Sequence, residues 1–223
     1  MKKIILFAIP LILAIAAFAA EPDKDISKLP KPDKKISMTL FDALQKRHSV
    51  RSFSDKAIDK KTLSNMLWAA TGINREDGKM TAPTAMDARD IIVYVADKDG
   101  VSLYLPVENS LKQIIKEDIR PAIAERQKNM ASAPIFLLLI SDTSRFPRRD
   151  GIEATFAAED AGYVSQNICL AAEALGLATV PRHMMDRNAI KKALNLNESQ
   201  LIMLNHPIGY EAKKEKARKA EKK

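Results

Sequence analysis

The segment that most restricts how this chain can fold is "APIFLLLISD", residues 133–142. Its apolar residues run without interruption from Ile135 to Ile140, a stretch too short for a membrane-spanning helix. Such a run is typical of a β-strand that is buried on both faces of its sheet. A strand of this kind needs packed layers on both sides, so we expect helices around a central sheet.

Other segments supply the partners of this strand. "IIVYVA" (residues 91–96) is rich in β-branched residues, and "VSLYLP" (101–106) follows the turn "DKDG" as its hairpin partner. "QLIMLNHPIGY" (200–210) predicts a final strand. With helices before and between these strands, the order favours an α+β fold in which helices pack around a mixed sheet.

The first helix is predicted within "SMTLFDALQKRHS", residues 37–49. Thr39 and Asp42 fit a shortened capping box, and Leu40, Phe41 and Leu44 form one apolar face. The other predicted helices run from Asp59 as N-cap to Gly72, within Glu108–Met130, over Ile152–Leu177 and after Asp186 as N-cap.

The predicted helix over Ile152–Leu177 is rich in alanine and nearly uncharged in its second half. A helix of this composition belongs in the centre of a fold or in a dimer interface. It contains the single cysteine, Cys169, for which a buried structural thiol is favoured over a redox nucleophile. The three histidines are far apart and show no local metal-ligand spacing, so no zinc site is predicted.

The N-terminal residues, Met1 to about Ala20, have the composition of a secretory signal peptide. Lys2 and Lys3 precede an apolar run, and Ala17 and Ala19 supply the small residues of a cleavage site after Ala19. An uncleaved anchor or membrane helix is the alternative. We therefore expect residues 1–20 to direct the protein to the periplasm or otherwise to export it.

Residues 21–37 are rich in proline, lysine and aspartate, and they predict an extended leader before one domain over residues 38–210. The formal net charge is +8, of which Lys2 and Lys3 contribute +2 and residues 211–223, with seven Lys or Arg against three Glu, contribute +4. The domain is therefore close to neutral, and a nucleic-acid partner is not expected. The tail is either a solvated end or a surface for anionic lipid or polymer.

The stretch "RHSVRSF" (47–53) concentrates cationic and hydroxyl side chains at the end of the first predicted helix. Guanidinium groups bind phosphate with two-pronged geometry, and a serine hydroxyl both donates and accepts hydrogen bonds. These residues could hold a phosphorylated cofactor. The alternative is a solvated basic helix end whose cations complement the helix dipole.

Four motifs in order resemble the nitroreductase family of FMN-dependent flavoproteins. They are "RHSVRSF" (47–53), "APTAMDA" (82–88), "GLATVPRHM" (176–184) and "HPIGY" (206–210). The resemblance covers about Leu40 to Tyr210, and it looks closest to the small azoline-dehydrogenase-like branch. It implies a three-layer α+β fold and a homodimer that binds FMN at its interface.

The resemblance also implies which residues contact FMN. Arg47, His48, Ser49 and Arg51 would contact its phosphate, ribityl and pyrimidine regions. Pro83, Thr84, Ala85 and Asp87 match a segment that reaches the flavin from the partner subunit of the dimer. Pro181, Arg182, His183 and Met184 match the segment that passes the flavin ring near N5. Members often carry a basic phosphate ligand after "GY", which points to Lys213 or Lys214.

Two positions depart from the family pattern. Asp87 stands where the family usually has asparagine, and a carboxylate lacks the donor of an amide. Arg89 begins "RDI" where many members continue "QPW", so an aromatic residue is missing. Either change could retune the flavin or mark a member that has lost the usual activity.

Several side chains also have a purely structural interpretation. His183 could cap a helix or lie in the core, Met184 could serve packing, and Arg182 could pair with Glu159 or Asp160. The acid-rich stretch "IEATFAAED" (152–160) could supply a general acid and base, but at helical spacing a solvated face is the commoner explanation.

The resemblance implies an FMN-dependent oxidoreductase that transfers hydride or electrons through flavin N5, and the signal-like N-terminus implies that it is exported. The acceptor would be a nitroaromatic, a quinone or a similar compound, or the enzyme would oxidise a small substrate. The electron donor would be NAD(P)H or, since NAD(P)H is scarce outside the cytoplasm, a membrane or protein donor. The alternative is a catalytically degenerate protein that binds flavin or a partner with the same fold. No catalytic residue and no metal ligand are assigned.

Overall fold

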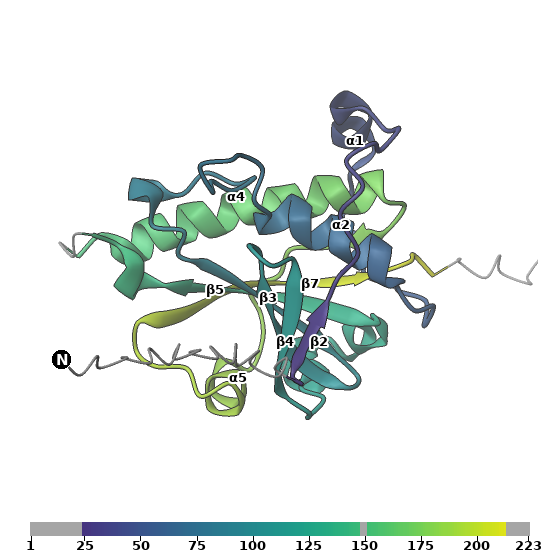
Figure 1. Cartoon of the computed structure of the whole chain (residues 1–223). Coiled ribbons are helices and arrows are strands. Elements are labelled where there is room, and N and C mark those ends of the chain that lie inside the picture. The colour runs from purple at the N-terminus through teal and green to yellow at the C-terminus, as the bar shows by residue number, and fades with distance from the viewer. Residues whose placement is uncertain (1–23, 148–150, 213–223) are drawn as a thin grey trace, which may run out of the picture.

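The computed structural model describes residues 24–147 and 151–212, which form helices on both sides of one sheet (Figure 1). The strands are β1 (Ile26–Lys28), β2 (Ile91–Asp97), β3 (Gly100–Leu105), β4 (Ser110–Ile115), β5 (Ile135–Asp142), β6 (Ala178–Thr179) and β7 (Gln200–Gly209). The α-helices are α1 (Leu40–Lys46), α2 (Lys60–Thr71), α3 (Arg120–Ala124), α4 (Glu153–Ala174) and α5 (Arg187–Ala193). Short 3₁₀ turns lie at Ala85–Asp87, Lys128–Ser132 and Thr143–Arg145.

The sheet has seven strands in the order β1-β4-β3-β2-β5-β7-β6. Each neighbouring pair is antiparallel. The predicted α+β class is confirmed, but the expectation of a mixed sheet is wrong. Turns connect β2 to β3 and β3 to β4, and α5 lies between β6 and β7; the other neighbouring pairs join strands that are not consecutive, and they too run antiparallel.

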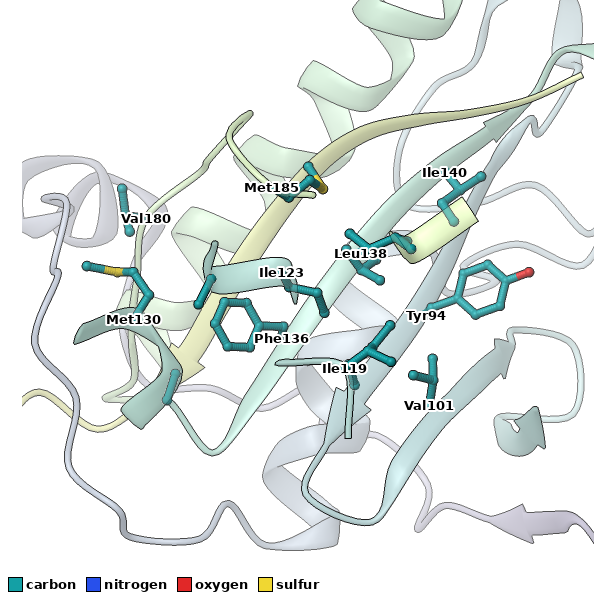
Figure 2. Close-up of a cluster of buried hydrophobic side chains, with 14 of the residues drawn as sticks. Tyr94, Val101, Ile119, Ile123, Met130, Phe136, Leu138, Ile140, Val180 and Met185 are labelled. Atoms are coloured by element: carbon teal, nitrogen blue, oxygen red, sulfur yellow. The ribbon is translucent and has the colours of Figure 1, made fainter. Parts of the chain in front are cut away.

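Strand β5 lies inside the sheet between β2 and β7, and its side chains are buried on both faces, as its apolar run predicts. Leu137 and Leu139 point into the core beneath α2 and α4. Phe136, Leu138 and Ile140 point to the opposite face, where Ile123 of α3 and Met185 complete a second core (Figure 2). In Figure 1, α2 and α4 cover one face of the sheet and α5 lies on the other, which gives three layers.

The helix predicted within Glu108–Met130 is largely wrong. Its first part is strand β4, whose residues pair with β3 from Leu105 to Val101 around a bulge. Only α3 and a 3₁₀ turn are helical, and α3 begins with Pro121 in its first turn. Burial along "SLKQII" does not alternate, since only Ser110 is buried and most of the others are half-buried, so the segment carries no period-2 signal and the third strand of the meander was not predicted.

The expected leader over residues 21–37 is also corrected, because part of it belongs to the sheet. Strand β1 pairs with β4, and beyond it the Pro30 carbonyl accepts hydrogen bonds from Ser64 Oγ at 2.6 Å and Asn109 Nδ2 at 2.9 Å. Asp33 N donates to Asn65 Oδ1 of α2 at 2.7 Å. The segment is extended, as its prolines predict, but it is fixed along the sheet edge and α2.

Helix capping follows the sequence closely. Thr39 Oγ1 accepts the Asp42 N–H at 3.1 Å, Asp59 Oδ1 accepts two N–H groups of α2, and Asp186 Oδ1 accepts the Ala189 N–H. After α4, Gly176 takes the left-handed conformation with φ +65°, which glycine adopts without steric cost. The N-terminal caps at Thr39, Asp59 and Asp186 are those that the sequence predicts.

Two helical surfaces lack a partner among the described residues. Helix α1 projects from the body, and its apolar side chains are exposed, with Phe41 at 80 %. Helix α4 leaves a stripe exposed that is mostly small or uncharged: Thr155, Ala158, Glu159, Gly162, Tyr163 and Gln166. The apolar face predicted for the first helix therefore does not pack into the core of its own chain.

Two expectations fall on parts of the chain that the structure does not describe. The predicted signal peptide falls within residues 1–23, and the basic tail falls almost entirely within residues 213–223. Among residues 24–147 and 151–212, no helix is both long and apolar enough to cross a bilayer.

Candidate flavin site

Three of the four motif segments meet at one end of the sheet. Val50 N donates to Thr179 O at 3.0 Å, which ties "RHSVRSF" to β6. Ser54 N donates to Tyr210 O at 2.9 Å, and Ala212 N donates to Ser52 O at 3.0 Å. The backbone of residues 50–54 is thereby fixed between the end of β7 and the start of the segment that carries Pro181–Met184.

The side chains of this first segment face outward. Val50 and Phe53 are buried and anchor the segment, whereas His48, Ser49 and Arg51 are exposed. Neither Arg47 nor Arg51 forms an ion pair with any described residue. Two free guanidinium groups beside an exposed hydroxyl suit a phosphorylated ligand.

A cavity of about 180 Å³ lies behind the segment. It is lined by His48, Val50, Thr179, Glu211 and the α4 residue Cys169, among others. Cys169 is buried, as predicted for a structural thiol, and burial raises the pKa of its thiol although nearby Arg47 partly opposes the effect. A raised pKa disfavours the thiolate, so this environment does not suit a redox nucleophile.

In the segment Pro181–Met184 only one side chain points inward. The Arg182 guanidinium is buried, and it donates to Gln127 Oε1 at 2.8 Å, Asn205 Oδ1 at 2.8 Å, and the carbonyls of Ile123 and Ala124. The alternative that Arg182 pairs with Glu159 or Asp160 is wrong, because its partners are neutral oxygens. Only its backbone is therefore placed to face a ligand.

The neighbours of Arg182 face solvent. Pro181, His183 and Met184 are exposed, so the expectation of a core position does not hold for His183. Arg187 Nη2 lies 3.0 Å from His183 Nε2 and donates to the His183 carbonyl at 3.2 Å. Arg187 thus orients the end of this segment.

Asn205 is a residue that the sequence analysis did not single out. It is fully buried, exchanges two 2.8 Å backbone hydrogen bonds with Arg182, and donates through Nδ2 to the Met184 carbonyl at 3.2 Å. Asn205 therefore sets the path of the segment Arg182–Met184. The available signal was an amide in the middle of the apolar strand "LIMLNHPIG", because a buried polar residue needs partners.

His206, the next residue, joins three elements. Its Nε2 lies 2.9 Å from Ser165 Oγ of α4, and its Nδ1 lies 3.2 Å from Thr179 Oγ1 of β6. Complete burial lowers the pKa of His206 to about 3, so the ring is neutral. The first residue of "HPIGY" is thus structural and connects α4 to the strands beside the site.

The fourth segment lies apart from the other three in the same chain. Ala85 N donates to the carboxylate oxygens of Asp160 at 2.9 and 3.0 Å. Asp160 and the cavity residue Cys169 are both on α4, two and a half turns or about 14 Å apart along its axis. Pro83, Thr84, Ala85 and Asp87 are therefore not brought to the Arg47 cluster of their own subunit.

This segment has an unusual backbone. Met86, Asp87 and Arg89 all have positive φ, between 50° and 54°. Arg89 N donates to Thr84 Oγ1 at 3.1 Å, and the Arg89 side chain contacts both Asp87 carboxylate oxygens at 3.2 and 3.3 Å. That contact lowers the pKa of Asp87, so the two departures from the family pattern form one ion pair.

The acid-rich stretch before and within α4 does not behave as one solvated face. Glu159 is exposed, as expected, but Asp160 is 1 % exposed and lies against the backbone of Ala85. The described residues contain no group of three or more His, Cys, Asp or Glu that could hold a metal ion. The remaining expected phosphate ligand, Lys213 or Lys214, lies outside the described residues.

Comparison with known proteins agrees with this arrangement. Residues 44–210 match the model of the nitroreductase family. A curated protein of Methanocaldococcus jannaschii that carries the name of a nitroreductase is 32% identical over 180 residues, which cover 76% of this chain and 90% of that protein.

Solved structures lead to the same family. A crystal structure from Ralstonia eutropha JMP134, also named a nitroreductase, has a TM-score of 0.80 at 32% identity and covers 85% of this chain and 91% of its own. A nitroreductase family protein of Clostridium difficile 630 shares the fold with a TM-score of 0.59 at 22% identity, over 79% of this chain and 86% of its own. This chain, with its three-layer fold and its converging motif segments, belongs to the nitroreductase family, whose members are flavin-dependent oxidoreductases.

Proposed function

We propose that this chain is an exported, homodimeric FMN-dependent oxidoreductase. The observation that carries the proposal is the convergence of residues 47–53, 179–184 and 209–212, whose surface carries an exposed serine and two arginines that form no ion pair with any described residue. Membership of the nitroreductase family supports the flavin and the reaction class. A bound flavin would supply hydride and electron transfer at its N5.

The residues of the chain would bind and orient that cofactor. Arg47 and Arg51 would hold the phosphate, and the Ser49 hydroxyl would contact the pyrimidine edge. The backbone from Arg182 to Met184, fixed by Asn205, would lie along the ring. Rigid placement of this kind is the main contribution that a protein makes to cofactor chemistry.

A homodimer would complete the site. The segment Pro83–Asp87 is held about 14 Å along α4 from the cavity beside His48, which supports its placement at the flavin of a second copy. The exposed stripe of α4 and the exposed apolar side chains of α1 supply a surface that a second copy would bury.

Gly162 offers a test of this dimer. It lies mid-helix on the exposed stripe of α4, and a Cβ at this position would meet no atom within 4 Å. Gly162→Leu should leave the subunit folded, since leucine favours helix more than glycine, but it should block close packing of two α4 helices and yield a monomer. Sedimentation equilibrium would measure the mass. Asn188→Leu on α5, across the sheet, is the matched control and should remain dimeric; an unchanged mass for Gly162→Leu would contradict the interface.

The proposed acceptor is a nitroaromatic, a quinone or a similar compound. The donor is NAD(P)H or, for an exported protein, a membrane or protein donor. The signal-like composition of residues 1–20 supports export. Rapid reduction of the purified holoprotein by NADPH would count against a dedicated membrane donor.

A degenerate flavin- or partner-binding protein is the second candidate. The ion pair between Asp87 and Arg89 favours it, because it places a charged carboxylate where the family usually has an amide. In this case flavin would bind without turnover of nitroarene or quinone.

Flavin retention tests both candidates. Mature protein that is incubated with FMN and desalted should keep the visible flavin absorption. The double variant Arg47→Ala, Ser49→Ala should bind FMN at least about tenfold more weakly, since each charged hydrogen bond contributes about 1.5–3 kcal/mol. Lys98→Ala in the β2–β3 turn should bind as the wild type does. A folded, colourless wild type would exclude the enzyme, and retained flavin without turnover would support the degenerate protein.

A further inference from the structure

Two carboxyl groups lie together inside the protein beneath the segment Pro83–Arg89. Asp160 comes from α4, and Asp90 immediately precedes β2; they are 1 % and 0 % exposed. Both oxygens of Asp160 lie within 3.0 Å of Ala85 N. Ser141 Oγ donates to Asp90 Oδ2 at 2.5 Å, whereas Asp90 Oδ1 has no hydrogen-bond partner among the described residues.

No described cation neutralises this pair. Arg89 contacts Asp87, and Arg145 contacts Asp142 and the Arg89 carbonyl. Among the described residues, Glu159 on α4 is the other charged group that acts on Asp160, and it adds negative charge. Two buried carboxylates without a cation are strongly unfavourable, since the desolvation cost and the mutual repulsion both act against the second charge.

One proton removes both difficulties. The Asp90 carboxyl lies within hydrogen-bonding reach of Asp160, but two ionised carboxylates cannot bond to each other. If Asp160 is protonated, its O–H can donate to Asp90 Oδ1 while its other oxygen accepts the Ala85 N–H. The otherwise unpartnered buried oxygen of Asp90 is then satisfied.

We propose that Asp90 and Asp160 share one proton and that this protonated pair acts as a positioning device for the segment Pro83–Arg89. The proposal rests on the proposed function in one respect, namely that this segment borders the flavin of a second copy. Asp90 and Asp160 are positioning residues, because they touch the segment and not the reacting groups.

Because the pair lies against the segment Pro83–Arg89, loss of its proton would change how firmly that segment is held. The segment holds three residues at positive φ, a conformation that non-glycine residues keep only when their surroundings impose it. The Ala85 N–H bond to Asp160 is the contact that joins this segment to α4. Burial and the neighbouring Asp90 raise the pKa of Asp160 to about 7, so the pair loses its proton as the pH rises past neutral. Two adjacent charges then repel each other, and the segment loosens.

The variant Asp160→Asn distinguishes an effect of protonation from an effect of side-chain packing. Its amide group has the shape of a protonated carboxyl, with an oxygen that accepts the Ala85 N–H and an N–H that donates to Asp90 Oδ1. Asp160→Asn should therefore fix the segment in its low-pH form at every pH. Asp160→Ala removes the contact altogether and should loosen the segment at every pH.

Amide hydrogen exchange of the apo protein, followed by mass spectrometry, tests the proposal. After correction for intrinsic exchange, peptides over residues 83–89 in the wild type should exchange about tenfold faster at about pH 8.5 than at about pH 6, while peptides of β5 stay unchanged. Asp160→Asn should show no such change, and Glu117→Gln, an exposed carboxyl between β4 and α3, should behave as the wild type does. Equal exchange of the wild type at both pH values, or a change that persists in Asp160→Asn, would overturn the proposal.

FMN titration at the same two pH values separates this proposal from the proposed function. A pH-dependent segment in a protein that binds no FMN would support the shared proton and reject the flavin site. Tight FMN binding with a segment whose exchange ignores pH would support the flavin site and reject the shared proton.

Discussion

Replacing Arg182 by methionine is expected to lower the free energy of unfolding by about 4 kcal/mol, because it leaves several buried oxygens without donors. The guanidinium donates to two side-chain oxygens and to the carbonyls of Ile123 and Ala124. Burial lowers the pKa of Arg182, with Glu125 partly offsetting the effect, so the site holds its cation through hydrogen bonds to neutral groups. Methionine fills a similar aliphatic volume but donates to none of them.

Urea unfolding followed by circular dichroism would measure this loss. Arg126→Met is the matched control, since the Arg126 side chain is 87% exposed and its contact with Glu125 lies at the surface. Arg182→Lys should recover only part of the stability, because an ammonium group cannot reach acceptors on several sides. If Arg182→Met lowers the free energy of unfolding no more than Arg126→Met does, the buried network contributes little and Asn205 alone orders the segment Arg182–Met184.

The pH dependence of stability should be governed by two buried groups, His206 and Asp160, which change the free energy of unfolding in opposite directions as the pH rises. The folded pKa of His206 is about 3, below its ordinary value of 6.5, so the unfolded chain binds a proton that the folded protein lacks, and stability is lost as the pH falls below 6.5. The folded pKa of Asp160 is about 7, above its ordinary value of 3.8, so the folded protein binds the extra proton, and stability is lost as the pH rises from 3.8 towards 7. Between about pH 4 and about pH 6.5 the two slopes oppose each other, and the wild type should show a broad plateau.

Removing either group should reveal the other. In His206→Gln the free energy of unfolding should fall with rising pH across this window, by up to about 1.4 kcal/mol per pH unit, because Asp160 acts alone. In Asp160→Asn it should rise with pH by a similar slope, because His206 acts alone. Urea midpoints at several pH values would measure both slopes. Slopes of the same sign in the two variants would contradict the assignment of these groups.

The parts of the fold that could be predicted are those decided by local chemistry. The buried strand β5, the β2–β3 hairpin and the first residue of α2 follow from an apolar run, a turn sequence and the capping residue Asp59. The errors occur where tertiary pairing decides the outcome. Strand β4 is stabilised by β3 on one side and β1 on the other, and the residues of β4 alone do not predict either neighbour.

The candidate site also has features that the sequence predicts and features that only tertiary structure determines. The resemblance identified the segments, and the structure brings three of them together through backbone hydrogen bonds. Sequence could not foresee which side chains point inward, so Arg182 and His206 became interior groups while His183 stayed exposed. Helical periodicity predicts a solvated face for Asp160, because it describes only which residues share one side of a helix. The segment that covers Asp160 comes from 75 positions earlier in the chain.

The pairing of β1 with β4 has a consequence for the order in which the chain folds. Ile26 lies opposite Lys112, so the first strand to leave the ribosome cannot dock until more than eighty further residues have been made. Without β1, β4 would be an open sheet edge, the type of surface on which chains associate with one another. The N-terminal segment, rich in proline and charge, resists premature structure during this delay. Because β1 is already synthesised when β4 is made, it can pair with β4 at once and cover the edge that would otherwise be open to association with other chains.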